Sequence, residues 1–141
     1  MTGQAGYVPT APTNPSVTES TTLNIKTEWD LPADMGTGTL QGYQIKRDNV
    51  VVVNATMNDY YDDTNVLPGI SYDYAIATWN EAGLGAFTST LTDTAGYPPT
   101  APTSASITDA TVNNIRTAWS LPSDMGTGNL LRYQVKKDNV V

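Results

Sequence analysis

The chain has 141 residues and a formal charge of −7, and it contains neither cysteine nor histidine. These absences exclude disulfides, cysteine nucleophiles, histidine bases and metal sites built on thiolates or imidazoles. An acidic chain without a basic patch also argues against binding to nucleic acid or to an anionic membrane surface. Threonine, a β-branched residue that favours strands, occupies 22 positions. The composition therefore predicts an all-β protein that is not an enzyme and carries no cofactor.

Residues 1–6 are not expected to be a signal peptide: either a signal was removed, or the chain is a segment of something longer, or export is not needed. No membrane span is expected either. Residues 1–6 have no basic start and no apolar stretch, so they do not have the pattern of a signal peptide. The longest aliphatic run covers residues 50–53, which is far too short to cross a bilayer. We therefore expect no membrane insertion.

The chain repeats itself with a period of 90 residues. Residues 5–51 align without a gap on residues 95–141 and are identical at 30 of 47 positions. Such self-similarity marks an array of one structural unit, and the period suits a small β-sandwich. The second copy stops just past its midpoint. The sequence thus predicts an N-terminal lead at 1–8, a complete domain at 9–94, a Pro/Thr-rich linker at 95–103, and the first three strands of a second domain at 104–141.

Alternation of apolar and polar residues predicts seven strands in the complete unit. Proline and glycine separate them: Leu31-Pro32 ends the second strand, and Leu67-Pro68-Gly69 turns the chain later on. Turn signals at intervals of about 8–12 residues are typical of a β-sandwich. The expected strands lie near residues 16–18, 23–29, 41–47, 50–54, 57–62, 72–76 and 86–92.

Several residues together resemble a fibronectin type III domain. They are Pro9 and Pro12, Trp29, Tyr43, Tyr61 with Asp63, the spacing of Leu67 and Tyr72, and Asn80 with Gly83 and Gly85. The resemblance implies a seven-stranded, immunoglobulin-like sandwich in tandem, with the second unit truncated. It also implies a tyrosine corner, in which the Tyr72 hydroxyl bonds to backbone near Leu67. The expected structural core consists of Trp29, Tyr43, Leu67, Tyr72, Tyr74 and Ile76.

Two motifs are candidates for ion or ligand binding. Asp59, Asp62 and Asp63 lie close together but lack the spacing of an EF-hand, and alternation sends Asp62 and Asp63 to opposite faces. We expect no metal here, but a solvated strand end with Asp63 bonded to the following turn. The loop at 34–38 recurs at 124–128, and no helix follows its Gly-x-Gly, which disfavours a phosphate site. Its repetition indicates either a shared binding surface or duplication.

Glycan attachment is a further possibility that the sequence raises. Asn54-Ala55-Thr56 is an acceptor sequence for N-glycosylation and follows a short strand. The threonines of the two Pro/Thr-rich segments are candidates for O-glycosylation, or else belong to a stiff, unmodified linker. These threonines are Thr10, Thr13, Thr100 and Thr103.

The half unit raises the question of assembly. Its inward residues lack the facing half of their core, so order in this segment requires added strands. Another chain supplies them by strand addition, or the polymer continues with them. The uncharged run at 50–53 also suits lateral pairing through Val50 and Val52. The expected partners are other copies of the chain, which would cover the remaining assembly candidates Ile115, Trp119, Tyr133 and Val135.

These observations favour a structural repeat unit of an extracellular or cell-surface fibre or array, acting as a spacer or adhesin stalk. The alternative is a ligand-binding ectodomain or a viral tail module. It would present the loops at 34–39 and 80–85 to a protein or a glycan.

Overall fold

The computed structural model describes residues 5–141, so the first four residues of the expected N-terminal lead lie outside the described residues. The chain divides into two compact units, Met1–Gly96 (unit 1) and Tyr97–Val141 (unit 2). All the regular elements between residues 5 and 141 are strands. Within that range, no helix is long and apolar enough to span a membrane. The expected all-β fold class is confirmed.

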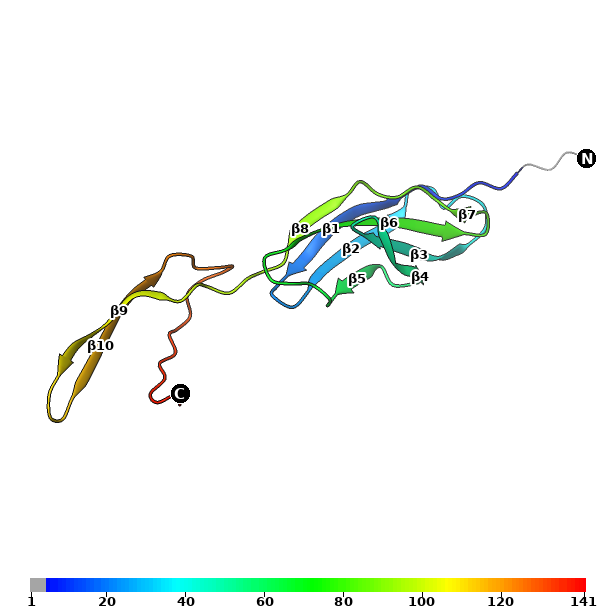
Figure 1. Ribbon diagram of the computed structural model, residues 1–141. Helices are drawn as coiled ribbons and strands as arrows, with labels where there is room; N and C mark the ends of the chain where they lie inside the picture. The colour runs from blue at the N-terminus through cyan, green and yellow to red at the C-terminus, as the bar shows by residue number, and fades with distance from the viewer. Residues whose placement is uncertain (1–4) are drawn as a thin grey trace, which may run out of the picture. The chain divides into compact units, whose positions relative to one another are not determined.

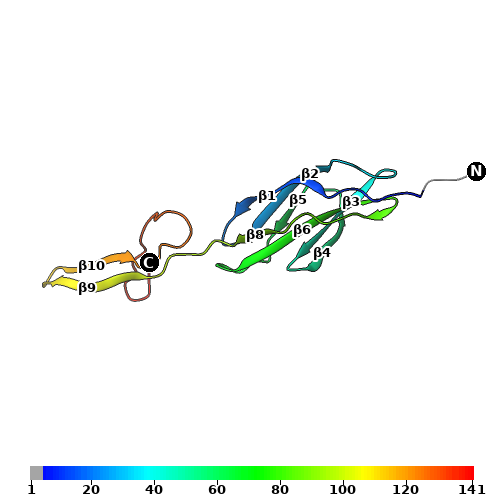
Figure 2. The same cartoon turned by 90° about the horizontal axis from the view of Figure 1, so that it is seen from above.

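Unit 1 is a sandwich of two antiparallel sheets (Figure 1). The first sheet has the order β1-β2-β5 and contains β1 (Pro12–Ser20), β2 (Ile25–Pro32) and β5 (Tyr60–Asp63). The second sheet has the order β4-β3-β6-β7, with β8 also paired to β6. It contains β3 (Leu40–Arg47), β4 (Val50–Thr56), β6 (Ser71–Asn80), β7 (Gly83–Leu84) and β8 (Leu91–Thr94). Figure 2 shows the two sheets of unit 1 from above.

The alternation in the sequence explains which faces of the strands are buried. In β2, Ile25, Thr27 and Trp29 are buried, while Lys26 and Glu28 between them are only half-buried. Successive side chains of a strand point to opposite faces, so every second residue reaches the space between the sheets. The same period in β6 buries Tyr72, Tyr74 and Ile76.

Two strands differ from the sequence-based expectation. The strand expected at 86–92 is replaced by β7 and β8, with residues 85–90 between them outside regular structure. Thr88 contacts β6 at one point only: its N–H donates to the Ile76 carbonyl at 2.8 Å, and its hydroxyl accepts from the Ile76 N–H at 3.1 Å. The strand expected at 57–62 starts instead at Tyr60, because Asn58 N–H is held by the Thr56 hydroxyl at 3.2 Å.

The core of unit 1 consists of two clusters. One contains Trp29, Tyr43, Ile45 and Ile76, and the Trp29 and Tyr43 rings meet edge to face at 5.4 Å and 68°. The other contains Ile25, Val66, Tyr72, Tyr74 and Ala95.

The expected core position of Leu67 is wrong, because its side chain is 66% exposed. The preceding residue, Val66, takes the buried position, and Leu67 stands at the start of the turn through Pro68 and Gly69. Leu67 contributes to the tyrosine corner through its backbone, since its N–H donates to the Tyr72 hydroxyl at 2.9 Å.

Replacing Tyr72 by phenylalanine is expected to destabilise unit 1 by about 1–3 kcal/mol, because the Leu67 N–H then loses its acceptor. The ring, which is almost fully buried, stays in place. Urea unfolding of the wild type and of Tyr72→Phe, followed by circular dichroism, measures the difference. Equal midpoints would mean that the hydrogen bond of this corner contributes nothing.

Unit 2 contains one hairpin, formed by β9 (Pro102–Ala110) and β10 (Ile115–Pro122). The third strand expected in this unit is not formed, since residues 130–136 carry no strand assignment. In unit 1 the corresponding strand, β3, is held between β4 and β6. Unit 2 has no counterpart of either neighbour, so the backbone of 130–136 has no ladder to join.

Candidate functional site

The repeated loop holds the segment that leads into the first strand of each unit. In unit 1, Thr37 N–H donates to the Tyr7 carbonyl at 2.9 Å, and Tyr7 N–H donates to the Thr37 hydroxyl at 2.9 Å. In unit 2, Tyr97 and Thr127 make the same two bonds at 2.9 and 3.1 Å. The repetition of this loop therefore has a structural use, which is to fasten the Ala-Gly-Tyr segment that enters the sandwich.

Asn80 completes the fastening in unit 1. Its side-chain amide donates to the Tyr7 carbonyl at 2.9 Å and to the Met35 carbonyl at 3.0 Å. Its side-chain oxygen accepts from the N–H groups of Ala82 and Gly83 at 2.8 and 3.1 Å. All four hydrogen bonds of the Asn80 amide are thus made within the chain. Gly36 lies at a φ of 67°, where a β-carbon would collide with both Asn80 and Tyr7.

The segment expected as a linker, residues 95–103, is divided between the units. Ala95 is fully buried in unit 1, where its N–H donates to the Ile70 carbonyl at 2.9 Å. Gly96 N–H donates to the Thr21 carbonyl at 2.9 Å. The next residue, Tyr97, already belongs to unit 2 through Thr127. Gly96 is therefore bonded to unit 1, and the next residue, Tyr97, is bonded to unit 2.

The four candidate threonines all donate their hydroxyls to backbone carbonyls. Thr10 and Thr100 bond to the carbonyls of Asp34 and Asp124, each at 3.2 Å. Thr13 and Thr103 bond to the carbonyls of Leu31 and Leu121, each at 2.7 Å. An O-linked sugar would replace the donated proton at each site, so modification would remove these four bonds.

Asn54, the candidate for N-glycosylation, is exposed near the end of β4. Its side-chain oxygen accepts from the Gln44 amide at 3.0 Å, and its backbone carbonyl accepts from the Trp79 indole N–H at 3.1 Å. The polar atoms that hold Asn54 in place are thus its oxygens, whereas a glycan attaches to the amide nitrogen.

The strand end at Asp63 is not solvated, contrary to the expectation from the sequence. Asp63 is 1% exposed, and Arg47 donates to its two carboxylate oxygens at 2.9 and 3.2 Å. The Tyr74 hydroxyl also donates to it, at 2.8 Å. The expected bond to the following turn is present, from Asn65 N–H at 3.0 Å. The hydrogen bond from Arg47 to Asp63 raises the pKa of the Arg47 guanidinium above its ordinary value, so this group stays charged.

Alkaline pH is expected to destabilise unit 1 through Tyr74. Burial, followed by the hydrogen bond to Asp63, raises the pKa of Tyr74 far above its ordinary value. Its contribution is fully present below the unfolded pKa of about 10, and it is lost as the pH rises beyond that value. Urea midpoints between pH 8 and 12 should fall for the wild type and fall less for Tyr74→Phe. Parallel curves for the two proteins would contradict this assignment.

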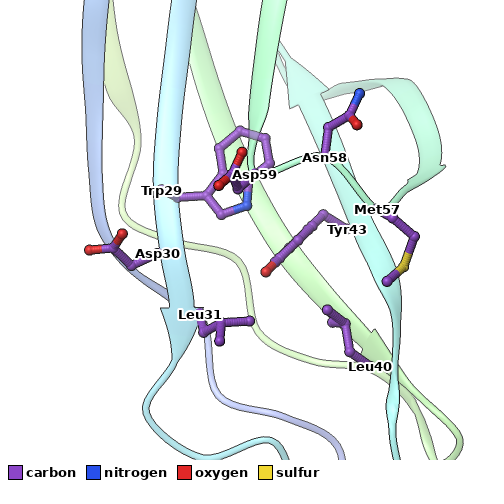
Figure 3. Close-up of a pocket in the computed structure, with 8 residues that line it drawn as sticks. All are labelled: Trp29, Asp30, Leu31, Leu40, Tyr43, Met57, Asn58 and Asp59. Atoms are coloured by element: carbon purple, nitrogen blue, oxygen red, sulfur yellow. The ribbon is translucent and has the colours of Figure 1, made fainter.

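A pocket of about 590 Å³ opens beside Trp29 (Figure 3). Trp29 and Tyr43 are buried at its floor, and Asp30, Asp59 and Met57 are exposed at its rim. Burial, with a smaller contribution from Asp59, raises the pKa of Tyr43. The Trp29 indole N–H has no hydrogen-bond partner within residues 5–141, and its ring meets Tyr43 edge to face. The floor of this pocket is thus the aromatic core itself.

The structure does not bring the acidic residues of unit 1 together as a metal site. Asp62 is exposed and accepts from the Asn24 amide at 2.8 Å, whereas Asp63 is buried. Across residues 5–141, no three acidic side chains are grouped closely enough to hold an ion.

The assembly candidates are exposed in both units. Val50 and Val52 lie on β4, which is an edge strand of its sheet and pairs with β3 alone. Trp119 is 37% exposed, against 3% for Trp29 at the same position of unit 1, and Ile115 is 69% exposed, against 0% for Ile25. Tyr133 and Val135 are exposed as well. Among the described residues, unit 2 therefore leaves exposed the residue types that unit 1 buries.

Comparison with known proteins agrees with this architecture. No family model matches the chain. Mouse usherin is 28% identical over 118 residues, which span 82% of this chain but 2% of usherin. The chain therefore corresponds to a very small part of that relative.

Solved structures are similar at lower identity. A solution structure of a fourth FNIII domain, from human, has a TM-score of 0.58 at 20% identity and covers 67% of this chain and 84% of its own. A crystal structure of titin domains has a TM-score of 0.57 at 18% identity, over 63% of this chain and 32% of the titin chain. The fibronectin type III domain of human fibronectin type III domain containing protein 3 has a TM-score of 0.55 at 13% identity, over 67% and 92%. The chain therefore has a fibronectin type III-like fold.

Proposed function

We propose that the chain is a structural repeat unit of an extracellular or cell-surface array, a spacer or stalk without enzymatic activity. The observation that carries this proposal is that the tyrosine of Ala-Gly-Tyr is bonded to the same loop in both units. The same loop bonds Tyr7 in unit 1 and Tyr97 in unit 2, 90 residues apart. Because Gly96 and Tyr97 are bonded into different units, no unbonded connector residue lies between them. A junction without unbonded residues suits a part whose task is to set spacing.

Several features support a place outside the cell or on its surface. The fold is that of fibronectin type III domains, and usherin is a relative. A polar, threonine-rich surface keeps such an array soluble, and glycans on Asn54 would add to this effect. The partners would be other copies of the chain. They would supply the strands that unit 2 needs, or the polymer would continue with them, and β4 would pair laterally through Val50 and Val52.

Small-angle X-ray scattering on concatenated units tests the spacing role. Chains of two, three and four copies of residues 7–96 keep every fastening bond that unit 1 shows. We expect the maximum dimension to grow by the same increment with each added copy. Thr37→Val with Asn80→Ala, which removes the side-chain bonds to Tyr7, serves as the control and should broaden the distance distribution. A dimension that stops growing as copies are added would contradict a spacer.

A second candidate function is the presentation of loops to a protein or a glycan. The loops at 34–39 and 80–85 are joined, since the Thr39 hydroxyl donates to the Glu81 carboxylate at 3.1 Å and Asn80 bonds to Met35. They therefore form one surface, as a ligand-binding module requires. A glycan-array screen with the full chain tests this function. Binding that is lost in Glu81→Lys, with unit 1 still folded, would favour it over the spacer.

A further inference from the structure

The pocket beside Trp29 lies where unit 1 passes from one sheet to the other (Figure 3). Strand β2 contributes Trp29 and Asp30 to its wall, and β3 contributes Tyr43. The segment 57–59, which connects β4 to β5, forms the remaining wall. It is held in place because the backbone N–H of Trp29 donates to the Asp59 carbonyl at 3.1 Å. Both sheets of the closed sandwich therefore fix the shape of this pocket.

A buried donor of this pocket has no acceptor. Trp29 is 3% exposed, and its indole N–H makes no hydrogen bond within residues 5–141. In Figure 3 the nitrogen edge of the indole ring is turned toward the Tyr43 hydroxyl and the middle of the lining residues. The indole N–H of Trp79, by contrast, donates to the Asn54 carbonyl at 3.1 Å. Because buried donors are nearly always paired, the Trp29 indole favours a ligand that brings an oxygen atom.

The rim of the pocket supplies acceptors. The exposed Asp59 carboxylate has no basic side chain within ion-pair distance in the described part of the chain. Asp30 accepts from the Asn14 amide at 2.9 Å, and a carboxylate can accept several further hydrogen bonds. A second pocket of about 410 Å³ shares both aspartates and adds Asn14, Ser16 and Glu28. Among residues 5–141, no basic side chain lines either pocket.

These groups define the chemistry of a matching ligand. It must offer an acceptor to the indole N–H and donors to the carboxylates, and hydroxyl groups do both. An anion is repelled by the acidic rim, and an ammonium ion has no acceptor for the indole. The exposed side chains of Leu31 and Met57 line the same pocket and suit the C–H groups of a sugar ring. The volume of about 590 Å³ lies within the range of small-molecule sites, about 300–1,000 Å³.

We propose that this pocket binds a short neutral saccharide, whose hydroxyl groups accept from the Trp29 indole N–H and donate to the carboxylates of Asp59 and Asp30. The saccharide is either free or part of a glycan attached to another protein, since the recognised groups are the same in both. The site goes beyond the spacer role. It also differs from the surface of the second candidate function, because none of its lining residues belongs to the loops at 34–39 and 80–85.

The three tryptophans allow NMR to test this proposal in the full chain. Each gives one indole N–H signal, and Trp79 and Trp119, which lie outside the pocket, serve as internal controls. The variants Trp79→Phe and Trp119→Phe assign the signals. Methyl glycosides of glucose, galactose, mannose and N-acetylglucosamine, and the disaccharides of glucose and N-acetylglucosamine, are titrated at millimolar concentration. We expect a member of this panel to shift the Trp29 signal saturably and to leave the other two unchanged.

A pair of substitutions tests the role of the rim. Asp59→Ala is expected to weaken saccharide binding at least about tenfold, because a hydrogen bond to a charged acceptor is lost. The backbone carbonyl that holds Trp29 remains in this variant, so unit 1 stays folded. Asp62→Ala is the matched control, since Asp62 is exposed and lines neither pocket. Its affinity should equal that of the wild type, and equal weakening by both substitutions would overturn the proposal.

The remaining outcomes are equally distinct. A Trp29 signal that no saccharide of the panel moves would overturn the proposal. A shift caused by lysine methyl ester and by none of the saccharides would overturn it as well, in favour of a cation site. The saccharide that binds most tightly is then compared free and linked to a short peptide. Equal affinity supports a free saccharide as the ligand, and tighter binding of the glycopeptide supports a protein-attached glycan. The scattering of concatenated units decides the spacer role independently of these results.

Discussion

Replacing Trp29 by alanine is expected to destabilise unit 1 by about 3–5 kcal/mol, as large-to-small changes at buried tryptophans do. Trp29 is almost wholly buried, and its ring packs on Tyr43, Ile45 and Ile76 between the two sheets. Collapse around the cavity is limited, because these neighbours belong to a closed sandwich. Since domains of this size are stable by about 5–15 kcal/mol, the variant would lie near the limit of folding.

Trp119→Ala is the matched control. It removes the same side chain at the equivalent position of unit 2, where the ring is partly exposed. Its effect on the urea midpoint of the cooperative transition should be close to zero, because that transition belongs to unit 1. Equal losses from the two substitutions, measured by circular dichroism at 25 °C, would contradict the view that only unit 1 encloses a core.

Replacing Asp63 by alanine is expected to cost about 3–5 kcal/mol, the range seen when one partner of a buried ion pair is removed. The substitution leaves the Arg47 guanidinium without its carboxylate and the Tyr74 hydroxyl without its acceptor. Asp62→Ala, one residue away on the exposed face, should cost less than about 1 kcal/mol, as surface polar contacts do. The ratio of the two effects, from denaturant unfolding, measures how much burial matters. Similar losses would mean that Asp63 is solvated in solution.

The strands that the sequence predicted best are those with strict alternation. In residues 25–29 and 72–76 every second side chain is aromatic or β-branched, and both segments lie within strands. Residues 86–92 alternate poorly, and only residues 91–92 join a ladder with β6, whereas Thr88 makes a local contact with that strand. Leu67 shows the limit of hydrophobicity as a guide, because at a turn the exposed leucine and the buried Val66 are neighbours of similar character.

The polar core of unit 1 could not be predicted from spacing. Asp63 and Arg47 are 16 residues apart and meet only because β2 pairs with β5 while Arg47 reaches over from the opposite sheet. The fastening by Asn80 has the same origin, since Tyr7 and Asn80 are 73 residues apart. The repetition of the loop at 34–38 indicated that the loop has a role, but it did not indicate which role. The hydrogen bonds to Tyr7 and Tyr97 show that the loop holds these residues.

Hydrogen exchange of the 141-residue chain tests the central claim most directly, namely that residues 5–96 form a closed sandwich while the strands of residues 97–141 form one hairpin. The amides of β2, β3 and β6 in unit 1 should exchange only through global unfolding, whereas those of β9 and β10 open locally. We predict protection in unit 1 at least about a thousandfold greater than in unit 2, as follows from a domain stability of about 5 kcal/mol. Comparable protection of β10 and β2 in the monomeric chain would contradict the account.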